Sequence, residues 1–185
     1  GGMCERLLLP AAKIHRSASL TLEQLALVET LGIGCHAADR AGVAPEDSVL
    51  IVGAGPIGLA VLEFARLATR EVTVIEMNPA RRAFVEAHHP GVRVLAEAPG
   101  GFHARVVFDA TGNPASMAGA PHLAGFGGRL VFVGITKDPV ALDDPLFHRR
   151  ELTLFASRNA LSSDFPRVIR LIEEGRIDTR PWISH

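Results

Sequence analysis

Cysteine is scarce in this sequence, and long apolar stretches are missing. Only Cys4 and Cys35 occur among the 185 residues, which excludes a disulfide framework and a structural zinc knuckle. We therefore expect two reduced thiols, as in a cytoplasmic protein. No run reaches the roughly 18 apolar residues of a transmembrane helix, and no signal-peptide pattern opens the chain. No membrane partner is therefore expected.

A strong excess of charge is also missing. Lysine and arginine number 19 and aspartate and glutamate 20, for a net charge of −1, so nothing indicates binding to nucleic acid or to an anionic membrane. Apolar residues make up 48% of the chain and charged residues 21%, which is ordinary for a globular protein. The length allows one domain with a hydrophobic core and at most a small appendage.

Short apolar runs alternate with helical patterns from residue 49 onward. Strands are expected at Val49–Gly53, Glu71–Glu76, Val92–Leu95, Arg105–Ala110, Gly128–Gly134 and Glu151–Ser157. Helices are expected at Pro56–Ala68, Pro79–His88, Pro114–Leu123 and Phe165–Glu174. This alternation predicts an α/β fold. Within that class we expect a Rossmann-type fold, a doubly wound parallel sheet of six strands with helices on both faces and the strand order 3-2-1-4-5-6.

The N-terminal part follows a different pattern. Arg6–Leu9 and Lys13–His15 are expected to form short strands. A long apolar helix is expected from Leu22 to Arg40, where Thr21 and Gln24 have the spacing of a capping box.

The sequence Gly53-Ala-Gly55-Pro56-Ile57-Gly58 follows a predicted strand and opens a predicted helix. This GxGxxG spacing is typical of dinucleotide-binding turns, in which the glycines allow a tight turn, a close approach of pyrophosphate and close packing of helix on strand. The amide groups and the positive end of the helix dipole then face the phosphates. The alternative is a tight strand-to-helix turn that holds no ligand.

An acidic residue, Glu76, ends the second predicted strand eighteen residues after Gly58. At that position it can accept hydrogen bonds from the ribose hydroxyls of an adenosine and repel a 2′-phosphate, which favours NAD over NADP. The alternative is a solvated strand end. Arg81 is a candidate to lie along the adenine or to weaken the bias against a 2′-phosphate, while Arg82 is expected to be solvated.

Two further turns follow predicted strands at the same edge of the sheet. Thr111 and Gly112 follow the fourth strand, and Val133 and Gly134 end the fifth. Ligands of doubly wound sheets lie at the carboxyl ends of the strands, so all four residues are candidates to border the cofactor. Ordinary turn chemistry is the alternative.

Several residues that could bind metals receive a simpler interpretation. Cys35 and His36 are adjacent and cannot share one helix face, so Cys35 is expected to be a packed thiol. His88 and His89 stand at a predicted helix end, where they are expected to interact with the helix dipole.

Four segments carry a wider resemblance. They are ALVETLGIGCHAADRAGVAPEDSVLIVGAGPIGLAV, VFDATGNPASM, GGRLVFVGI and SRNALSSDFPRVIRLIEEGRIDTRPWISH. Together they resemble the zinc-containing alcohol and polyol dehydrogenases of the medium-chain dehydrogenase/reductase family, over nearly the whole chain. The last segment is most similar to bacterial sugar-acid and polyol dehydrogenases.

The resemblance implies a division of the chain and a missing part. Residues 1–20 are expected to be the remnant of an upstream, barrel-like catalytic domain, and residues 21–185 an NAD(P)-binding Rossmann domain. The family's zinc ligands lie upstream of this sequence, so the zinc of the parent enzyme is expected to be absent here, and no catalytic residue is assigned. Glu29 matches a glutamate that can ligate zinc in polyol-type members, and Arg158 is expected near the nicotinamide or a substrate oxygen. Their alternatives are a helix residue without a ligand and a surface arginine.

The resemblance implies a parent enzyme that transfers a hydride between a secondary alcohol or polyol and NAD. We expect this chain to bind NAD without turning over substrate. A stand-alone NAD-binding sensor or scaffold is the first alternative. A pure interaction domain is the second, because Ala141–Phe155 is expected to expose a sheet edge that pairs across a homodimer.

Overall fold

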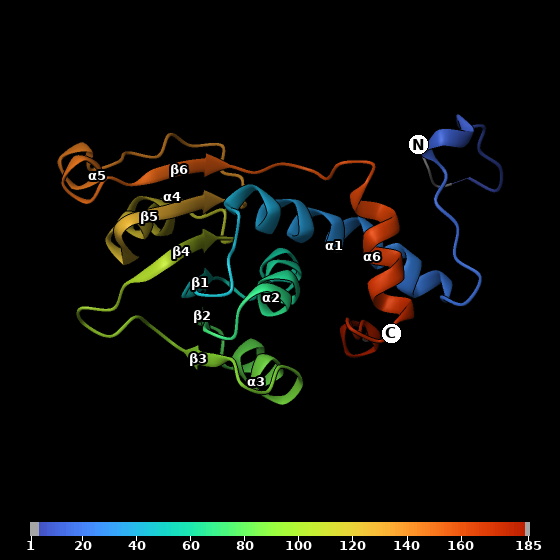
Figure 1. Cartoon of the computed structure of the whole chain (residues 1–185), viewed down its shortest axis with the longest axis horizontal. Helices are drawn as coiled ribbons and strands as arrows, with labels where there is room; N and C mark the ends of the chain where they lie inside the picture. Colours follow the sequence, from blue (N-terminus) through green and yellow to red (C-terminus); the bar gives the residue numbers. More distant parts are fainter. Residues whose placement is uncertain (1–3, 184–185) are drawn as a thin grey trace.

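The computed structural model describes residues 4–183, and its six parallel strands form one sheet in the order β3-β2-β1-β4-β5-β6 (Figure 1). The strands are β1 (Val49–Val52), β2 (Val72–Ile75), β3 (Arg93–Leu95), β4 (Ala104–Asp109), β5 (Ala124–Phe132) and β6 (Thr153–Ala156). The predicted fold class and strand order are confirmed. The order reverses between β1 and β4, which places both their carboxyl ends at the switch point of the sheet.

Helices cover both faces of the sheet, as predicted. They are α1 (Leu22–Ala41), α2 (Pro56–Ala68), α3 (Pro79–His88), α4 (Pro114–Gly119), α5 (Asp144–Arg150) and α6 (Asp164–Glu173). Side chains alternate along a strand: Val49 and Ile51 pack with α1, α2 and α3, while Leu50 packs in a cluster with residues that follow α4. No helix in residues 4–183 has the length and apolar character needed to cross a bilayer.

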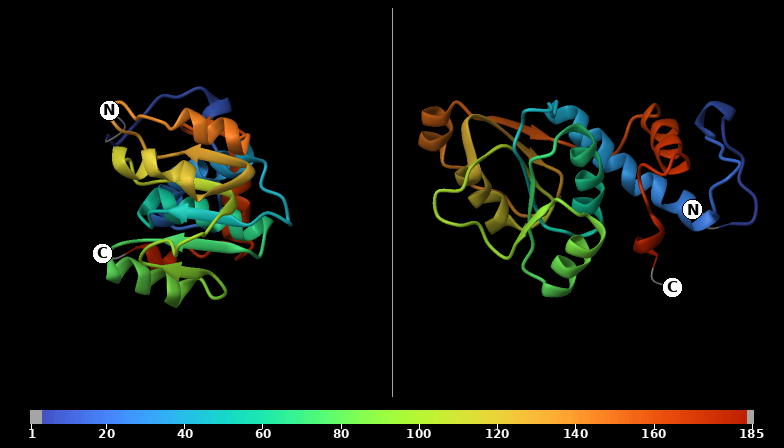
Figure 2. Two further views of the ribbon diagram at one scale, coloured as in Figure 1. Left: turned by 90° about the vertical axis from the view of Figure 1, so that its left-hand side faces the viewer. Right: turned by 60° about the horizontal axis from the view of Figure 1, so that its bottom comes forward.

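α6 belongs to a second layer, because it packs on α1 and α2 instead of on the strands (Figures 1 and 2). Val168 and Ile169 of α6 meet Val28 and Leu31 of α1 in this layer. α1 therefore has one side against the sheet and another side against α6.

The strands predicted at Arg6–Leu9 and Lys13–His15 are not formed. Residues 6–9 have no regular structure, and the short 3₁₀-helix η1 (Ala11–Lys13) replaces the start of the second. The physical reason is position. This segment lies at the end of the molecule occupied by α6, away from the sheet (Figure 2), so its backbone has no strand to pair with. Ser17 is attached to Glu173 of α6 by a hydrogen bond of 2.6 Å.

Two features of the elements bear on the predictions. The Thr21–Gln24 capping box of α1 is present, with the Gln24 amide donating to Thr21 Oγ1 at 3.3 Å. The seven-residue helix α5 was not predicted, although Asp143 caps it by accepting a hydrogen bond from the Leu146 amide.

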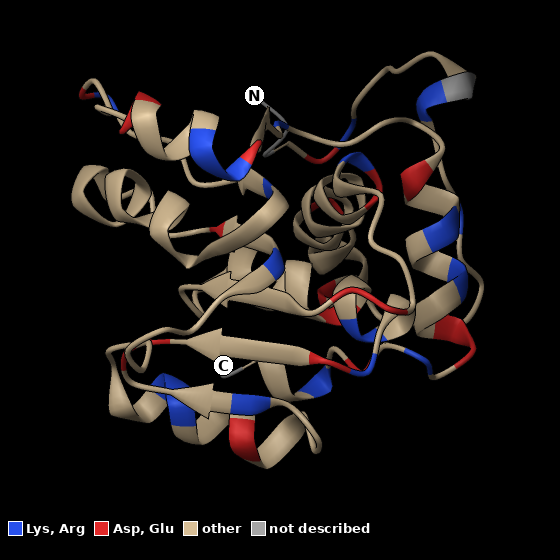
Figure 3. Cartoon of the chain, turned by 60° about the vertical axis from the view of Figure 1, so that its left-hand side comes forward, with Lys and Arg blue, Asp and Glu red and all other residues tan. Residues whose placement is uncertain are grey.

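Charged residues of both signs are interspersed along helices and loops in the view of Figure 3, in keeping with the small net charge.

Candidate functional site

The glycine turn joins β1 to α2, and two of its glycines are required by the protein itself. Gly53 has a φ of +94°, a left-handed conformation that side chains disfavour. A Cβ on Gly58 would lie 1.9 Å from the Gly53 carbonyl oxygen, so a side chain there would push α2 away from the turn. These two roles match the tight turn and the close packing that the sequence predicts.

Gly55 differs from both, because nothing in the described chain requires it to be glycine. Its φ of −73° suits any residue, and the nearest atom to an added Cβ is the Arg81 guanidinium nitrogen at 4.0 Å. Gly55 is also the N-cap of α2, and no side chain within residues 4–183 caps that helix. The leading amides of α2 therefore have no capping side chain among these residues, which suits a phosphate group.

Glu76 is fastened to this turn. The side chain is buried, with 7% of the residue exposed, which contradicts the alternative of a solvated strand end. One carboxylate oxygen accepts a hydrogen bond from the Ala54 amide and the other from the Asn78 amide, each at 2.8 Å. Burial raises the pKa of the Glu76 carboxyl, but these two hydrogen bonds and the charge of Arg81 outweigh it, so the pKa lies below its usual value. A negative charge therefore stands beside the glycine turn.

The two arginines of α3 have different surroundings. Arg81 lies 3.7 Å from the Glu76 carboxylate and is more than half exposed next to the glycine turn. Arg82, expected to be solvated, instead donates to the carbonyl oxygens of Glu76 and Met77 at 2.8 and 2.7 Å. Arg81 is therefore the arginine available to a ligand, and Arg82 holds the backbone after β2 in place.

Asp109 organises the neighbouring turns, and the sequence analysis did not single it out. This fully buried carboxylate accepts hydrogen bonds from the Thr111 amide at 2.9 Å, the Thr111 hydroxyl at 2.6 Å and the Ser116 hydroxyl at 2.6 Å. Its backbone carbonyl accepts from the amides of Val133 and Gly134. Asp109 therefore joins the ends of β4 and β5. An acidic residue closing an apolar run, with a hydroxyl two residues later, was the available signal.

A hollow of about 340 Å³ lies at these strand ends. The predicted residues Thr111, Gly112, Val133, Gly134 and Arg158 all line it, together with Ile33, Ile57, Ala110, Ile135, Ser157 and Asn159. Ile57 belongs to the GxGxxG segment, so the glycine turn and the hollow are continuous. The exposed Arg158 side chain makes no hydrogen bond or ion pair within the described part of the chain.

The two glycines of the hollow are required by packing. A Cβ on Gly134 would lie 2.3 Å from the Gly112 amide nitrogen, and Gly112 itself has a φ of +62°. Their identity therefore follows from the contact between the two turns.

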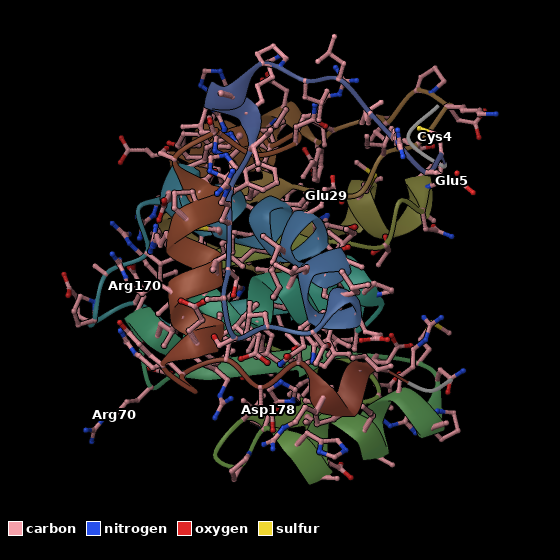
Figure 4. All side chains as sticks on the ribbon, turned by 90° about the vertical axis from the view of Figure 1, so that its right-hand side faces the viewer. Cys4, Glu5, Glu29, Arg70, Arg170 and Asp178 are labelled. Atoms are coloured by element: carbon pink, nitrogen blue, oxygen red, sulfur yellow. The ribbon has the colours of Figure 1, made fainter. Side chains whose placement is uncertain are left out.

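The residues described do not form a zinc site around Glu29. Glu29 is exposed on α1 (Figure 4) and belongs to no group of three ligating side chains in residues 4–183. The group that does occur is Cys35, Asp39 and Asp164, and there Asp39 binds Arg167 at 2.6 Å. Burial raises the pKa of the Cys35 thiol to about 12, whereas zinc binds the thiolate. Cys35 is the packed thiol that was predicted.

His89 stands at the C-cap of α3, the helix end at which it was predicted, and its ring has a partner that the sequence analysis did not name. The ring is buried and its Nε2 lies 2.9 Å from the Glu63 carboxylate of α2. His88, its neighbour, is exposed. Sequence spacing could not reveal a partner 26 positions away on another helix.

Comparison with known proteins places this geometry in a family. Residues 56–174 match the family model of the zinc-binding dehydrogenases. L-galactonate-5-dehydrogenase of Escherichia coli K12 is 38% identical over the whole chain. An alcohol dehydrogenase of Escherichia coli CFT073, solved with NADH, superimposes with a TM-score of 0.84 at 24% identity over 96% of the chain. A zinc-binding dehydrogenase of Sinorhizobium meliloti, solved with NADP, gives 0.79 at 22% identity over 88%. These two structures show the shared fold alone.

The chain spans about half the length of these proteins: 57% of the galactonate dehydrogenase and 56% and 52% of the two solved chains. The family match covers the glycine turn from Pro56 onward, both later turns and α6. The predicted resemblance is confirmed, and the chain belongs to the zinc-binding dehydrogenases of the medium-chain dehydrogenase/reductase family, of which it represents the cofactor-binding part.

Proposed function

We propose that this chain is the NAD-binding half of a zinc-dependent polyol or sugar-acid dehydrogenase. The observation that carries the proposal is Gly55, whose missing side chain leaves open space in front of the uncapped N-terminus of α2. Neither strain nor internal packing accounts for this glycine, so we attribute it to the close approach of a ligand.

The site divides along the length of a dinucleotide. The first turn of α2 would hold the pyrophosphate, Glu76 the adenosine ribose with Arg81 beside it, and the hollow near Gly134 and Arg158 the nicotinamide. Bound NAD supplies the hydride acceptor. The residues of this chain bind it, orient it and cover part of the ring.

Glu76 supports NAD over NADP. Its carboxylate is charged and immobilised by two amides, so a 2′-phosphate would meet a fixed negative charge. The structural neighbours include proteins solved with NADH and with NADP, so the discrimination has to come from individual residues. Arg81 lies close enough to reduce the repulsion, but it is already paired with Glu76.

The remainder of the enzyme is part of the same proposal. The segment before α1 exposes Leu7, Leu8, Leu9 and Ile14, in keeping with residues 1–20 as a remnant of a catalytic domain that would cover them. Exposed Glu29 would contribute to zinc only together with ligands from that domain. The substrate class follows the name of the galactonate dehydrogenase relative, and the reduced thiols favour the cytoplasm.

A titration with NADH and then NADPH, followed by cofactor fluorescence, tests the proposal. We expect tighter binding of NADH, and we expect Glu76→Gln to narrow the difference, because the substitution removes the charge that opposes the 2′-phosphate. Equal affinity for both cofactors in the unsubstituted chain would refute the role of Glu76. Binding of neither would favour a scaffold. Added zinc, NAD and a polyol should give no turnover with this chain, and measurable oxidation would contradict the missing zinc site.

One observation favours self-association as a second function. β6 ends the strand order and, within residues 4–183, pairs with β5 alone, and Leu154 on it is 39% exposed. We propose that two copies pair along β6 to form a homodimer. The sensor or scaffold alternative is distinguished by the reading frame, because an upstream Gly-His-Glu and a nearby cysteine would favour the enzyme.

A further inference from the structure

Ser157 carries a buried hydroxyl with no hydrogen-bond partner. It follows β6, where its amide donates to the Phe132 carbonyl at 2.9 Å. Only 5% of the residue is exposed, and within residues 4–183 no donor or acceptor reaches its Oγ. Burying an unpaired hydroxyl opposes folding, so this serine needs an explanation that the folded chain alone does not supply.

The position of Ser157 supplies one. The described chain has three buried side-chain atoms without a partner: His89 Nδ1, Thr179 Oγ1 and Ser157 Oγ. Of these three residues, only Ser157 lines the hollow at the strand ends. Its Oγ is covered by neighbouring atoms, so rotation about the Cα–Cβ bond would bring the hydroxyl to a polar group of a ligand in that hollow.

The other walls of the hollow narrow the choice of ligand group. Ile33, Ile57 and Val133 contribute apolar side chains, which suit the faces of a flat ring. A serine hydroxyl can donate and accept at once, and a carboxamide offers both an acceptor oxygen and donor hydrogens. The neighbouring Arg158, which has no partner among residues 4–183, would suit a negatively charged substituent better.

We propose that the Ser157 hydroxyl binds the carboxamide of the nicotinamide ring and fixes the orientation of that ring. This inference rests on the proposed function and names a residue that the sequence analysis did not assign. It predicts effects of opposite sign for one substitution. Removing the hydroxyl should stabilise the cofactor-free chain, because an unpaired buried group is lost. It should also lower the affinity for NADH, because a hydrogen bond to the ligand is lost.

The experiment compares Ser157→Ala with Thr179→Val, which removes the other unpaired buried hydroxyl, outside the hollow. Each chain is titrated with NADH and with ADP-ribose, which lacks the nicotinamide, and its thermal midpoint is measured without ligand. For Ser157→Ala we expect NADH to bind about fivefold more weakly, ADP-ribose to bind as before, and the midpoint to rise by about 2 °C. For Thr179→Val we expect the rise in midpoint without any change in either affinity.

Three results would overturn the inference. An unchanged affinity of Ser157→Ala for NADH would show that the hydroxyl does not bind the carboxamide. A parallel loss for NADH and ADP-ribose shows a structural role for the serine. Equal affinity of the unsubstituted chain for NADH and ADP-ribose would show that the hollow does not bind the nicotinamide. The assignment of the glycine turn as a dinucleotide site would be unaffected. Failure of the unsubstituted chain to bind either ligand would remove the proposed function, and this inference with it.

Discussion

Glycine at position 55 occupies extended backbone that alanine adopts without strain, and its missing side chain would face open space. Gly55→Ala and Gly55→Val should therefore leave the thermal midpoint nearly unchanged. We expect alanine to lower the affinity for NADH at least tenfold and valine to abolish measurable binding. The reason is that a methyl group at this position displaces a phosphate from the amides of α2. Isothermal titration and thermal unfolding measure both effects on the same samples.

The matched control is Gly119→Ala. This glycine likewise leaves room for a Cβ, because no atom of the described chain outside its own helix backbone lies within 4 Å of one, and it stands at the far end of α4, outside the hollow. It should change neither stability nor affinity appreciably. Unchanged NADH affinity in Gly55→Val would sink the assignment of the turn as a dinucleotide site.

At the scale of elements, prediction worked where a local signal coincided with a partner in space. The start of α1 is an example: the spacing of Thr21 and Gln24 predicts a capping box, and both of its hydrogen bonds are formed. Arg6–Leu9 has the apolar character of a strand but no neighbour to pair with, so propensity alone was misleading. α5 has a cap at Asp143 but is too short for an apolar period to be recognised.

The candidate site could be recognised in the sequence only where its residues lie at a fixed spacing. Its glycines and Glu76 are marked by fixed spacing along the chain. The hydrogen bonds of Asp109 and the unpaired hydroxyl of Ser157 arise only in the folded chain. Neither residue has a sequence spacing that marks it. His89 belongs with them, because its partner comes from a different helix.

The contact between His89 and Glu63 connects the segment after α3 to α2, and it should be a strong stabilising contact. Both groups are buried, at 2% and 6% exposure, so removing one leaves the other without its partner. We expect His89→Leu and Glu63→Leu each to lower the free energy of unfolding by about 3 kcal/mol. The double variant should be more stable than either single variant, because two apolar groups replace the pair.

Urea denaturation of the four chains gives the coupling energy as a double-mutant cycle. His88→Leu serves as the control, since His88 is exposed, and it should stay within about 0.5 kcal/mol of the parent. Additive losses in the cycle would mean that the two side chains do not depend on one another.

For the molecule as a whole, we expect the edge strand β6 to set the state of association. The Ser157 amide points to β5, and amides alternate in direction along a strand, so the Leu154 amide points away from the sheet. Leu154→Pro should therefore remove an edge donor without breaking the pairing with β5. Light scattering after size exclusion should show a dimer for the parent and for Leu154→Thr, and a monomer for Leu154→Pro. A parent chain that stays monomeric at high concentration would exclude β6 pairing.

Because α6 comes late in the sequence, the second layer that it makes with α1 can form only late in the synthesis of the chain. Arg167 of α6 and Asp39 of α1, which meet at 2.6 Å, are 128 positions apart. At ribosomal rates of about 5–20 residues per second, that separation corresponds to roughly ten seconds of synthesis. During this interval the sheet can assemble against one side of α1, while Val28 and Leu31 on its other side wait for a helix not yet made. The nascent chain therefore presents an apolar surface that a chaperone could cover until α6 emerges.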